Sequence, residues 1–278
     1  MANLFPTTTT IRNEVKLSMG AEQDLLYEKE GQLAWVTVNR PGQRNAFTFD
    51  MYDRLAQLCE EVDADPDVRV MILRGAGGRS FASGTDIRQF LDFSSEADAL
   101  GYEEMITGRI GRLGRVTKPT IAMVQGFCVG GGFGLAMACD LRFCTPESRF
   151  GAPPARLGNI FAPGNTARLL QQIGPARTLD LLFTARQVPA DEAYHMGLVT
   201  AVVATDAIAA RVREVAETIC ANAPITIRET KKVVQRLLAE AGPAWRGEEY
   251  VLACYMSEDF KEGVRAFLEK RPPRWQGR

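Results

Sequence analysis

The sequence predicts an α/β protein in which short parallel strands alternate with helices and a helical segment completes the chain. Two stretches, residues 68–75 and 120–125, are almost uniformly apolar, which is typical of central parallel strands covered on both faces. Helical patterns follow both stretches, at distances that suit right-handed crossovers. Beyond Thr205 the patterns are helical alone.

The chain has 278 residues, of which 46% are hydrophobic and 24% are charged, enough to bury one large core. Residues 1–23 are polar and lack periodicity, so we expect a flexible tail. Residues 24–204 are predicted to form the core that carries the site, and residues 205–278 a helical module. The apolar face of this module exceeds what one small core needs, which indicates a subunit interface; it includes Tyr250, Val251, Cys254 and Phe267.

Composition excludes several classes of partner. A formal net charge of −1 gives no reason to expect nucleic acid. No apolar run approaches the roughly 20 residues needed to span a bilayer, and the first residues lack a signal-peptide pattern, so we expect no membrane contact. The six cysteines form no CxxC pair and mostly lie in apolar runs. This pattern predicts reduced thiols in a cytoplasmic protein and no metal site.

The first half of the chain reads as a hairpin followed by strands and helices. Apolar residues alternate over 24–30 and 32–39 around a turn at Gly31, and residues 40–46 form a loop. Asp50 is expected to cap a helix that reaches about Asp63. A strand over 68–75 then leads through a loop at 81–86 into a helix near 87–90 and a longer one over about 101–116.

The second half continues the same alternation. The strand at 120–125 enters a turn at Gly130, Gly131 and Gly132 that precedes a buried helix. Pro153 and Pro154 lack N–H donors, so residues 152–155 are expected to be irregular. We expect strands at 141–144, 149–151 and 198–203, and helices at 163–172, 175–184, 191–196, 206–221, 224–240 and 243–270.

Two loops are predicted to meet, the one at 81–86 and the triple-glycine turn. Each follows a strand and precedes a helix, so both present free backbone N–H groups at one sheet edge. Two such groups aimed at one point form an oxyanion hole. The alternative is that the three glycines only let the helix pack tightly on a strand.

Over residues 24–275 the sequence resembles the crotonase superfamily, the enoyl-CoA hydratase/isomerase family of acyl-CoA enzymes. The resemblance rests on motifs that occur in the family's order: Asn39-Arg40-Pro41, Arg44-Asn45-Ala46, Phe81-Ala82-Ser83-Gly84-Thr85-Asp86, Gly126 with Gly130-Gly131-Gly132, Ala138-Cys139-Asp140-Leu141-Arg142, Phe150-Gly151, Gly197-Leu198-Val199, Glu262-Gly263, Ala266-Phe267 and Glu269-Lys270-Arg271.

The resemblance implies a spiral of ββα units followed by helices that form a homotrimer, often within a dimer of trimers. It also implies that the backbone N–H groups of Thr85 and Gly131 form the oxyanion hole. Coenzyme A would be part of the thioester substrate, with no permanently bound cofactor. The residues implied to contact it are Arg44, Ala46, Phe81, Ala82, Ser83, Gly84 and, at the adenosine end, Phe267 and Lys270.

The sequence departs from the family at the acid–base residues. Hydratases of the family carry two glutamates that hold and split the added water. The corresponding positions are occupied here by Gly134 and Pro154. The standard two-glutamate hydration is therefore not expected.

Other polar residues near these motifs have functional and structural interpretations. Asp86, Arg156 and Asn159 are candidates for the acyl pocket, although Asp86 is also placed to cap a helix. Glu103 and Glu104 are candidate replacement carboxylates, with a solvated helix face as the favoured interpretation. Structural roles are also favoured for four further side chains, namely Asp140, His195, Cys128 and Cys144.

The sequence thus predicts an acyl-CoA enzyme of lyase or isomerase type that stabilises a thioester enolate. Decarboxylation of a malonyl-type CoA fits better than water addition, because loss of CO2 generates the enolate without a base. The alternative is an acyl-CoA-binding protein without catalytic activity.

Overall fold

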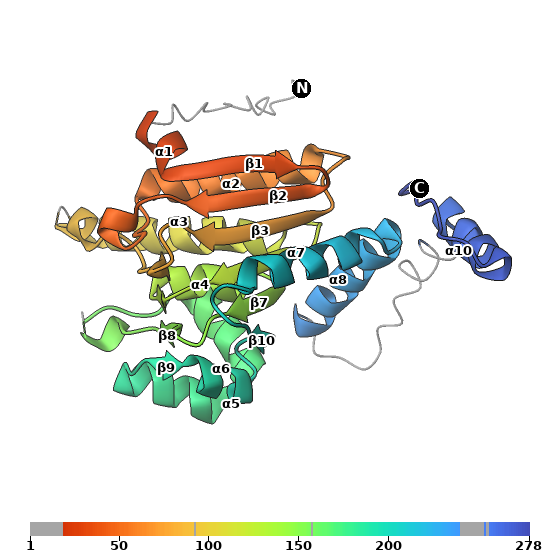
Figure 1. Cartoon of the computed structure of the whole chain (residues 1–278). Coiled ribbons are helices and arrows are strands. Elements are labelled where there is room, and N and C mark those ends of the chain that lie inside the picture. Colours follow the sequence, from red (N-terminus) through yellow and green to blue (C-terminus); the bar gives the residue numbers. More distant parts are fainter. Residues whose placement is uncertain (1–18, 92, 157, 240–252, 254–255) are drawn as a thin grey trace, which may run out of the picture.

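A computed structural model of the chain describes residues 19–91, 93–156, 158–239, 253 and 256–278 (Figure 1). The strands form two sheets, a large one in the order β1-β2-β3-β5-β7-β10 and a small one in the order β4-β6-β8-β9. The large sheet contains β1 (Leu25–Glu30), β2 (Leu33–Val38), β3 (Val70–Gly75), β5 (Thr120–Val124), β7 (Leu141–Cys144) and β10 (Ala201–Val202). The small sheet contains β4 (Ser80–Ala82), β6 (Phe127–Val129), β8 (Arg149–Gly151) and β9 (Val188–Pro189).

The chain alternates between the two sheets and then enters a helix, which produces a spiral of ββα units. The helices are α1 (Met19–Asp24), α2 (Phe49–Ala64), α3 (Glu96–Gly114), α4 (Gly131–Ala138), α5 (Pro163–Thr184), α6 (Ala190–Met196), α7 (Ile208–Cys220), α8 (Pro224–Ala239) and α10 (Glu258–Glu269). Short 3-10 helices are η1 (Pro41–Gln43), η2 (Ile87–Phe90) and η3 (Pro154–Arg156). Strand pairs are parallel except for the hairpin β1–β2 and the pair β8–β9. The predicted α/β class is confirmed.

The large sheet is buried on both faces. On one face, alternate residues of β2 such as Val36 and Val38 pack in the main core with side chains of α2, α3 and α4. On the other face, Trp35 packs with Ile72 of β3 and with α7, which crosses the sheet in Figure 1. Burial on both faces explains the uniformly apolar strand sequences.

Helix starts differ from the predicted ones because local capping groups decide them. Met19–Asp24 is helical, so the predicted tail over 1–23 is wrong in its last residues; residues 1–18 lie outside the described part. Thr48, and not Asp50, caps α2 by accepting a hydrogen bond from Met51 N. Helix α3 begins at Glu96, well before the predicted start, because Ser95 and Asp98 form a capping box.

The two glycine loops follow strands β4 and β6 of the small sheet. They were expected to follow central strands, which belong to the large sheet. Residues 80–82, part of a predicted loop, form strand β4, and β6 follows a turn at Gly126. A Cβ on Gly126 would lie 2.0 Å from Arg79 O, so this turn requires glycine. Residues 154–156 are a 3-10 helix where irregular chain was expected, and β10 covers only part of the predicted strand at 198–203.

The last part of the described chain is helical. Helices α7 and α8 match their predictions closely, while the predicted start of a helix at Pro243 lies outside the described residues. So do Tyr250, Val251 and Cys254 and the side chain of Phe267, which were proposed as an interface. The indole of Trp275 donates a hydrogen bond to Ala221 O and ties the segment after α10 to the end of α7. Among the described helices, none is long and apolar enough to cross a bilayer.

Candidate active site

Two sequence motifs lie side by side where β4 ends. The amide of Phe47 donates to Gly84 O at 2.8 Å, and the amide of Asp86 donates to Phe47 O at the same distance. Ser83 N donates to Arg44 O at 3.2 Å. The loop at residues 44–47 therefore runs beside the loop at 83–86. These contacts bring together most of the residues for which coenzyme A contacts were predicted.

Asn45 holds the first of these loops in place. Its side chain is fully buried, accepts a hydrogen bond from Arg40 N at 2.9 Å and donates to Ser80 O at 2.6 Å. The backbone of Asn45 has a positive φ of 57°, which asparagine tolerates better than most residues. These hydrogen bonds of the buried Asn45 amide hold the loop at residues 44–47 in place beside the site.

The amides of Thr85 and Gly131 are close neighbours. A Cβ built on Gly131 would lie 3.4 Å from Thr85 N and 2.4 Å from the Tyr52 hydroxyl. In the pairing with Phe47, the bonds are made by Gly84 O and Asp86 N, so the Thr85 N–H points away from it. Gly131 begins α4, where N–H groups lack intrahelical acceptors. The geometry suits two donors for one oxygen.

Gly132, the last glycine of the turn, has a packing role. A Cβ on Gly132 would lie 2.2 Å from Ala82 O, so close contact of helix α4 with β4 requires glycine there. Tight packing and an available N–H group at Gly131 thus coexist in one turn, and the two interpretations of the triple glycine do not exclude each other.

A row of hydroxyl groups supports the Thr85 loop. Thr85 Oγ1 is hydrogen-bonded to Tyr52 OH at 3.0 Å and to Tyr102 OH at 2.9 Å. Burial raises the pKa of both tyrosines, so both phenols remain neutral. This row, which sequence patterns do not reveal, ties α2 and α3 to the loop that carries the Thr85 amide.

The glycine-loop cavity, as we call it, is a hollow of about 110 Å³ at the ends of β4 and β6. Its lining includes Thr85, Gly131, Tyr102, Glu103, Pro154 and Asn165. Most of the remaining wall is apolar, with Phe90, Ile106 and Phe161 among the lining residues. A thioester carbonyl at the two amides would sit in an apolar enclosure.

Asn165 fills the space beside Gly134. A Cβ built on Gly134 would lie 2.4 Å from Asn165 Nδ2 and 2.8 Å from its Cγ. Asn165 is 2% exposed, and its Oδ1 accepts a hydrogen bond from Arg168 at 3.2 Å. A neutral amide thus lies against the position where the resemblance leads one to expect a carboxylate, and no sequence signal pointed to it.

Glu103 faces the glycine-loop cavity, contrary to the favoured interpretation of a solvated helix face. Its Oε2 is buried and makes no hydrogen bond to a described residue, and burial raises the pKa of the carboxyl. Glu104, the next residue, is exposed as predicted. A sequence signal existed: Glu103 precedes the buried Ile106 by three positions and Ile110 by seven, so it lies on the buried stripe of α3.

Asp86 caps η2 and is held by arginines. Its carboxylate accepts from Arg88 N at 3.3 Å and from Arg88 Nε at 2.9 Å, and Arg40 lies 3.6 Å away. Hydrogen bonds from Arg88 lower the pKa of Asp86 to about 2. A carboxylate so stabilised is a weak base, and Asp86 is not among the lining residues of the cavity.

The two remaining residues predicted for the acyl pocket differ in whether they line the cavity. Asn159 lines the glycine-loop cavity, whereas Arg156 is exposed and does not line it. Lys270, which follows α10, is exposed and is not among the lining residues of the cavity.

The residues with expected structural roles are held by fixed partners. Asp140 accepts hydrogen bonds from Thr120 N at 2.7 Å and from Lys231 Nζ at 2.7 Å, so a backbone amide and a lysine hold this carboxylate. His195 Nδ1 lies 2.7 Å from Asp191 O. Cys128 and Cys144 are buried, and burial raises the pKa of both thiols, for Cys144 to about 12. Neither thiol is available as a nucleophile at neutral pH.

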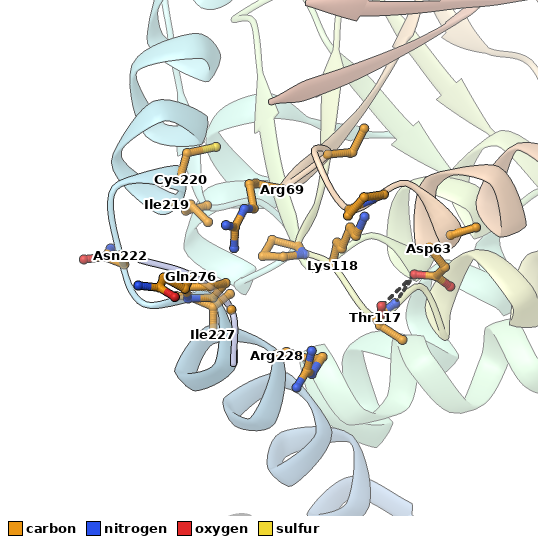
Figure 2. Close-up of a pocket in the computed structure, with 16 residues that line it drawn as sticks. Asp63, Arg69, Thr117, Lys118, Ile219, Cys220, Asn222, Ile227, Arg228 and Gln276 are labelled. Carbon is orange, nitrogen blue, oxygen red and sulfur yellow. Dashed lines mark hydrogen bonds between the residues drawn. The ribbon is translucent and has the colours of Figure 1, made fainter. Parts of the chain in front are cut away.

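A second hollow, the amino-end cavity, lies where β3 and β5 begin and has a volume of about 330 Å³ (Figure 2). Its lining includes Asp63, Thr117, Lys118, Arg69 and Arg228. Asp63 accepts hydrogen bonds from Thr117 N at 2.8 Å and from Arg112 at 2.6 Å, and Lys118 Nζ donates to Val62 O and Asp65 O. Arg69 is the exception, since its Nε is buried without a partner. Across the described residues, no cluster of ligand side chains is suited to a metal ion.

Comparison with known proteins agrees with these motifs. The family model "Enoyl-CoA hydratase/isomerase" matches residues 28–278. The chain is 35% identical to the short-chain-enoyl-CoA hydratase of Clostridium acetobutylicum over 252 residues, covering 89% of this chain and 95% of the relative. It is 34% identical to the crotonyl-CoA hydratase of Syntrophomonas wolfei over 255 residues, covering 90% and 97%. The crystal structure of the enoyl-CoA hydratase from Bacillus anthracis superposes with a TM-score of 0.87 at 28% identity, covering 92% of this chain and 100% of that one.

Proposed function

The chain belongs to the enoyl-CoA hydratase/isomerase family, and from this premise we propose that it is a lyase or isomerase that forms an enolate from an acyl-CoA thioester without the paired glutamates of hydration. The observation that carries the proposal is the composition of the glycine-loop cavity: Thr85 and Gly131 lie close together in its lining, but Pro154 lines it too, and Gly134 lies behind the lining residue Asn165. The first feature supports enolate stabilisation, and the second argues against water addition.

The two amides would stabilise the charge that develops on the thioester oxygen. Backbone N–H groups that are already oriented need no reorganisation during the reaction, and each donor contributes about 3 kcal/mol to transition-state stabilisation. The apolar lining, including Ile106 and Phe161, supports this role because a low dielectric strengthens such hydrogen bonds.

Water addition to an enoyl thioester requires groups that position a water molecule and transfer its proton. Gly134 has no side chain, and Pro154 has no titratable group. Asn165, which fills the space beside Gly134, is a neutral amide that can orient a ligand but cannot act as a base at neutral pH. We therefore do not expect hydration at ordinary enzymatic rates.

Decarboxylation of a malonyl-type CoA fits these groups. The bond between the α-carbon and the substrate carboxyl breaks, its electron pair forms the enolate, and CO2 leaves. An apolar cavity favours this step, because a carboxylate deprived of water is destabilised relative to the dispersed charge of the transition state. The backbone N–H groups of Thr85 and Gly131 then donate hydrogen bonds to the enolate oxygen.

Coenzyme A is proposed to lie over the paired loops at 44–47 and 83–86. Ser83 N bonds to Arg44 O, and Arg44 is exposed beside this junction, where a guanidinium suits phosphate groups. Phe267 and Lys270 would contact the adenosine end from a neighbouring subunit of a homotrimer or a dimer of trimers.

The neutral side chains around Gly134 also favour a second candidate, an acyl-CoA-binding protein without catalytic activity. Incubation of the purified protein with a panel of acyl-CoAs, followed by mass spectrometry, separates the candidates. The panel contains enoyl, malonyl-type and β,γ-unsaturated thioesters, with product chromatography to detect isomers of equal mass. Loss of CO2 or a shifted double bond supports the proposal, a gain of water contradicts it, and tight binding without turnover selects the second candidate.

A further inference from the structure

The half-buried carboxyl group of Glu103 differs from the buried carboxyl groups of the described chain, all of which have partners. Asp86 is held by Arg88, Asp259 by the amides of Gln276 and Gly277, and Glu229 by Arg228 and Lys232. The buried Oε2 of Glu103 has no partner, and no ion pair of Glu103 is found within the described residues. Leaving a buried polar atom unpaired is costly, so such an atom is usually retained for a function.

The backbone that carries Glu103 is anchored by the neighbouring residues of α3. Tyr102, the preceding residue, bonds to Thr85 Oγ1 at 2.9 Å and so anchors this turn of α3 to the loop that carries the Thr85 amide. The next turn of α3 is anchored by the buried Ile106. Glu103 and the two amides therefore line one cavity on elements that are tied together.

We infer that Glu103 is the acid–base group of the glycine-loop cavity, exchanging a proton with the α-carbon of the acyl group whose carbonyl oxygen is bound by the Thr85 and Gly131 amides. This inference rests on the proposed function and adds the residue that completes the reaction. It assigns to α3 a role that neither Gly134 nor Pro154 can perform.

The proton balance of decarboxylation is then complete. After CO2 has left, the double-bond electron pair of the enolate forms a new bond from the α-carbon to the proton of the Glu103 carboxyl, and the thioester carbonyl is restored. Glu103 is left as a carboxylate and regains a proton from water. In the reverse sense, the carboxylate removes an α-hydrogen from a bound saturated thioester.

A raised pKa of Glu103 also suits the substrate. Burial raises the pKa of this carboxyl, and a protonated carboxyl does not repel the carboxylate of a malonyl-type substrate. The half-buried position leaves a path to water for reprotonation.

The test uses α-hydrogen exchange, which needs no net reaction. The full-length protein is incubated with butyryl-CoA in deuterium oxide, and mass spectrometry follows deuterium entering the α-carbon. We compare the wild type with Glu103→Gln and Glu103→Asp and, as matched control, Glu104→Gln, which alters the exposed neighbour on the same helix. Thermal unfolding of each protein verifies that the fold is retained.

We expect exchange in the wild type and in Glu104→Gln, and a fall of about 100-fold to 1,000-fold in Glu103→Gln. Glu103→Asp should recover part of the rate. In the wild type, exchange should increase with pH as the carboxylate forms, and this dependence should disappear in Glu103→Gln. A purely structural role for Glu103 would not produce this change of the pH profile.

Two results overturn the inference: exchange in Glu103→Gln at the wild-type rate, or no exchange in a wild type that binds the thioester. Failure of the proposed function can be distinguished from failure of this inference. It would appear in the acyl-CoA panel as thioesters whose mass and double-bond position do not change, even if their α-hydrogens exchange.

Discussion

The two cavities of this chain differ in how their polar groups are satisfied. In the amino-end cavity, Asp63 and Lys118 have two or more partners each, and the exception is the Nε of Arg69. In the glycine-loop cavity, which is smaller, Thr85, Gly131 and Glu103 are lining residues, and the buried Oε2 of Glu103 has no partner among the described residues. The smaller hollow is the candidate site because its polar groups still lack partners, whereas those of the larger one mostly stabilise the fold.

This difference leads to a general expectation. Substitutions in the glycine-loop cavity should reduce turnover more than stability, and substitutions in the amino-end cavity should do the opposite. The following predictions test that contrast from the largest expected effect to the smallest.

Gly131→Ala should reduce turnover of the active acyl-CoA by about 100-fold to 1,000-fold. The added Cβ would lie 2.4 Å from the Tyr52 hydroxyl and displace the Gly131 amide. Steady-state kinetics with the active thioester measures this loss. Gly108→Ala is the control, because a Cβ there meets no atom within 4 Å. Equal turnover in Gly131→Ala and Gly108→Ala would mean that the Gly131 amide does not contribute to the reaction.

Gly134→Ala should lower the free energy of unfolding by about 1–3 kcal/mol, since the new Cβ overlaps the side chain of Asn165. Asn165→Ala should relieve this overlap, so the double variant should be more stable than the sum of the single effects by about 1 kcal/mol or more. Urea unfolding of the four proteins in this cycle gives the coupling. Additive effects would mean that Asn165 does not occupy the space beside Gly134.

Asp63→Asn should reduce the free energy of unfolding by about 1–3 kcal/mol and leave turnover unchanged. The carboxylate loses its charge pairing with Arg112 and one bond to Thr117. Urea unfolding and steady-state kinetics on the same preparation measure both quantities. A loss of turnover with unaltered stability would reverse the roles that we assign to the two cavities.

Asp86→Asn should show the smallest effect, confined to the pH dependence of stability. The folded-state pKa of Asp86 is lowered to about 2 by Arg88, while an unfolded aspartate titrates near about 3.9. The stabilisation is therefore present above about pH 4 and is lost as pH falls toward 2. Unfolding of the wild type and the variant between these limits should converge at the acid end. A constant difference would show that the ion pair with Arg88 does not set this pKa.

Much of the fold follows from periodicity that the sequence displays. Elements with long apolar patterns were predicted, because such a pattern remains visible despite a few irregular positions. They are the hairpin, the buried strands β3 and β5, and helices α5 to α8. Strand β4, with three residues, is too short for a period to be visible, and its existence depends on parallel pairing with β6. The start of α3 was misplaced because its first turn is exposed and is fixed by the Ser95 cap.

The site was predictable to the extent that it is made of backbone. The motifs at 81–86 and 130–132 brought Thr85 and Gly131 together in the prediction, and the structure brings these amides close. Contacts between distant side chains, such as Asn165 against Gly134 and Tyr52 against Thr85, depend on how helices pack and leave no periodic trace. Glu103 was misread because its neighbour Glu104 suggested a charged surface, although its spacing from Ile106 and Ile110 places it on the buried face.

The most direct test of the central claim is the reaction of purified protein with crotonyl-CoA, followed by mass spectrometry for the addition of water. The account predicts binding of the thioester without hydration above the uncatalysed rate, because Gly134 and Pro154 stand in place of the paired glutamates and Glu103 supplies only one carboxyl where water addition uses two. Hydration at ordinary enzymatic rates would contradict it.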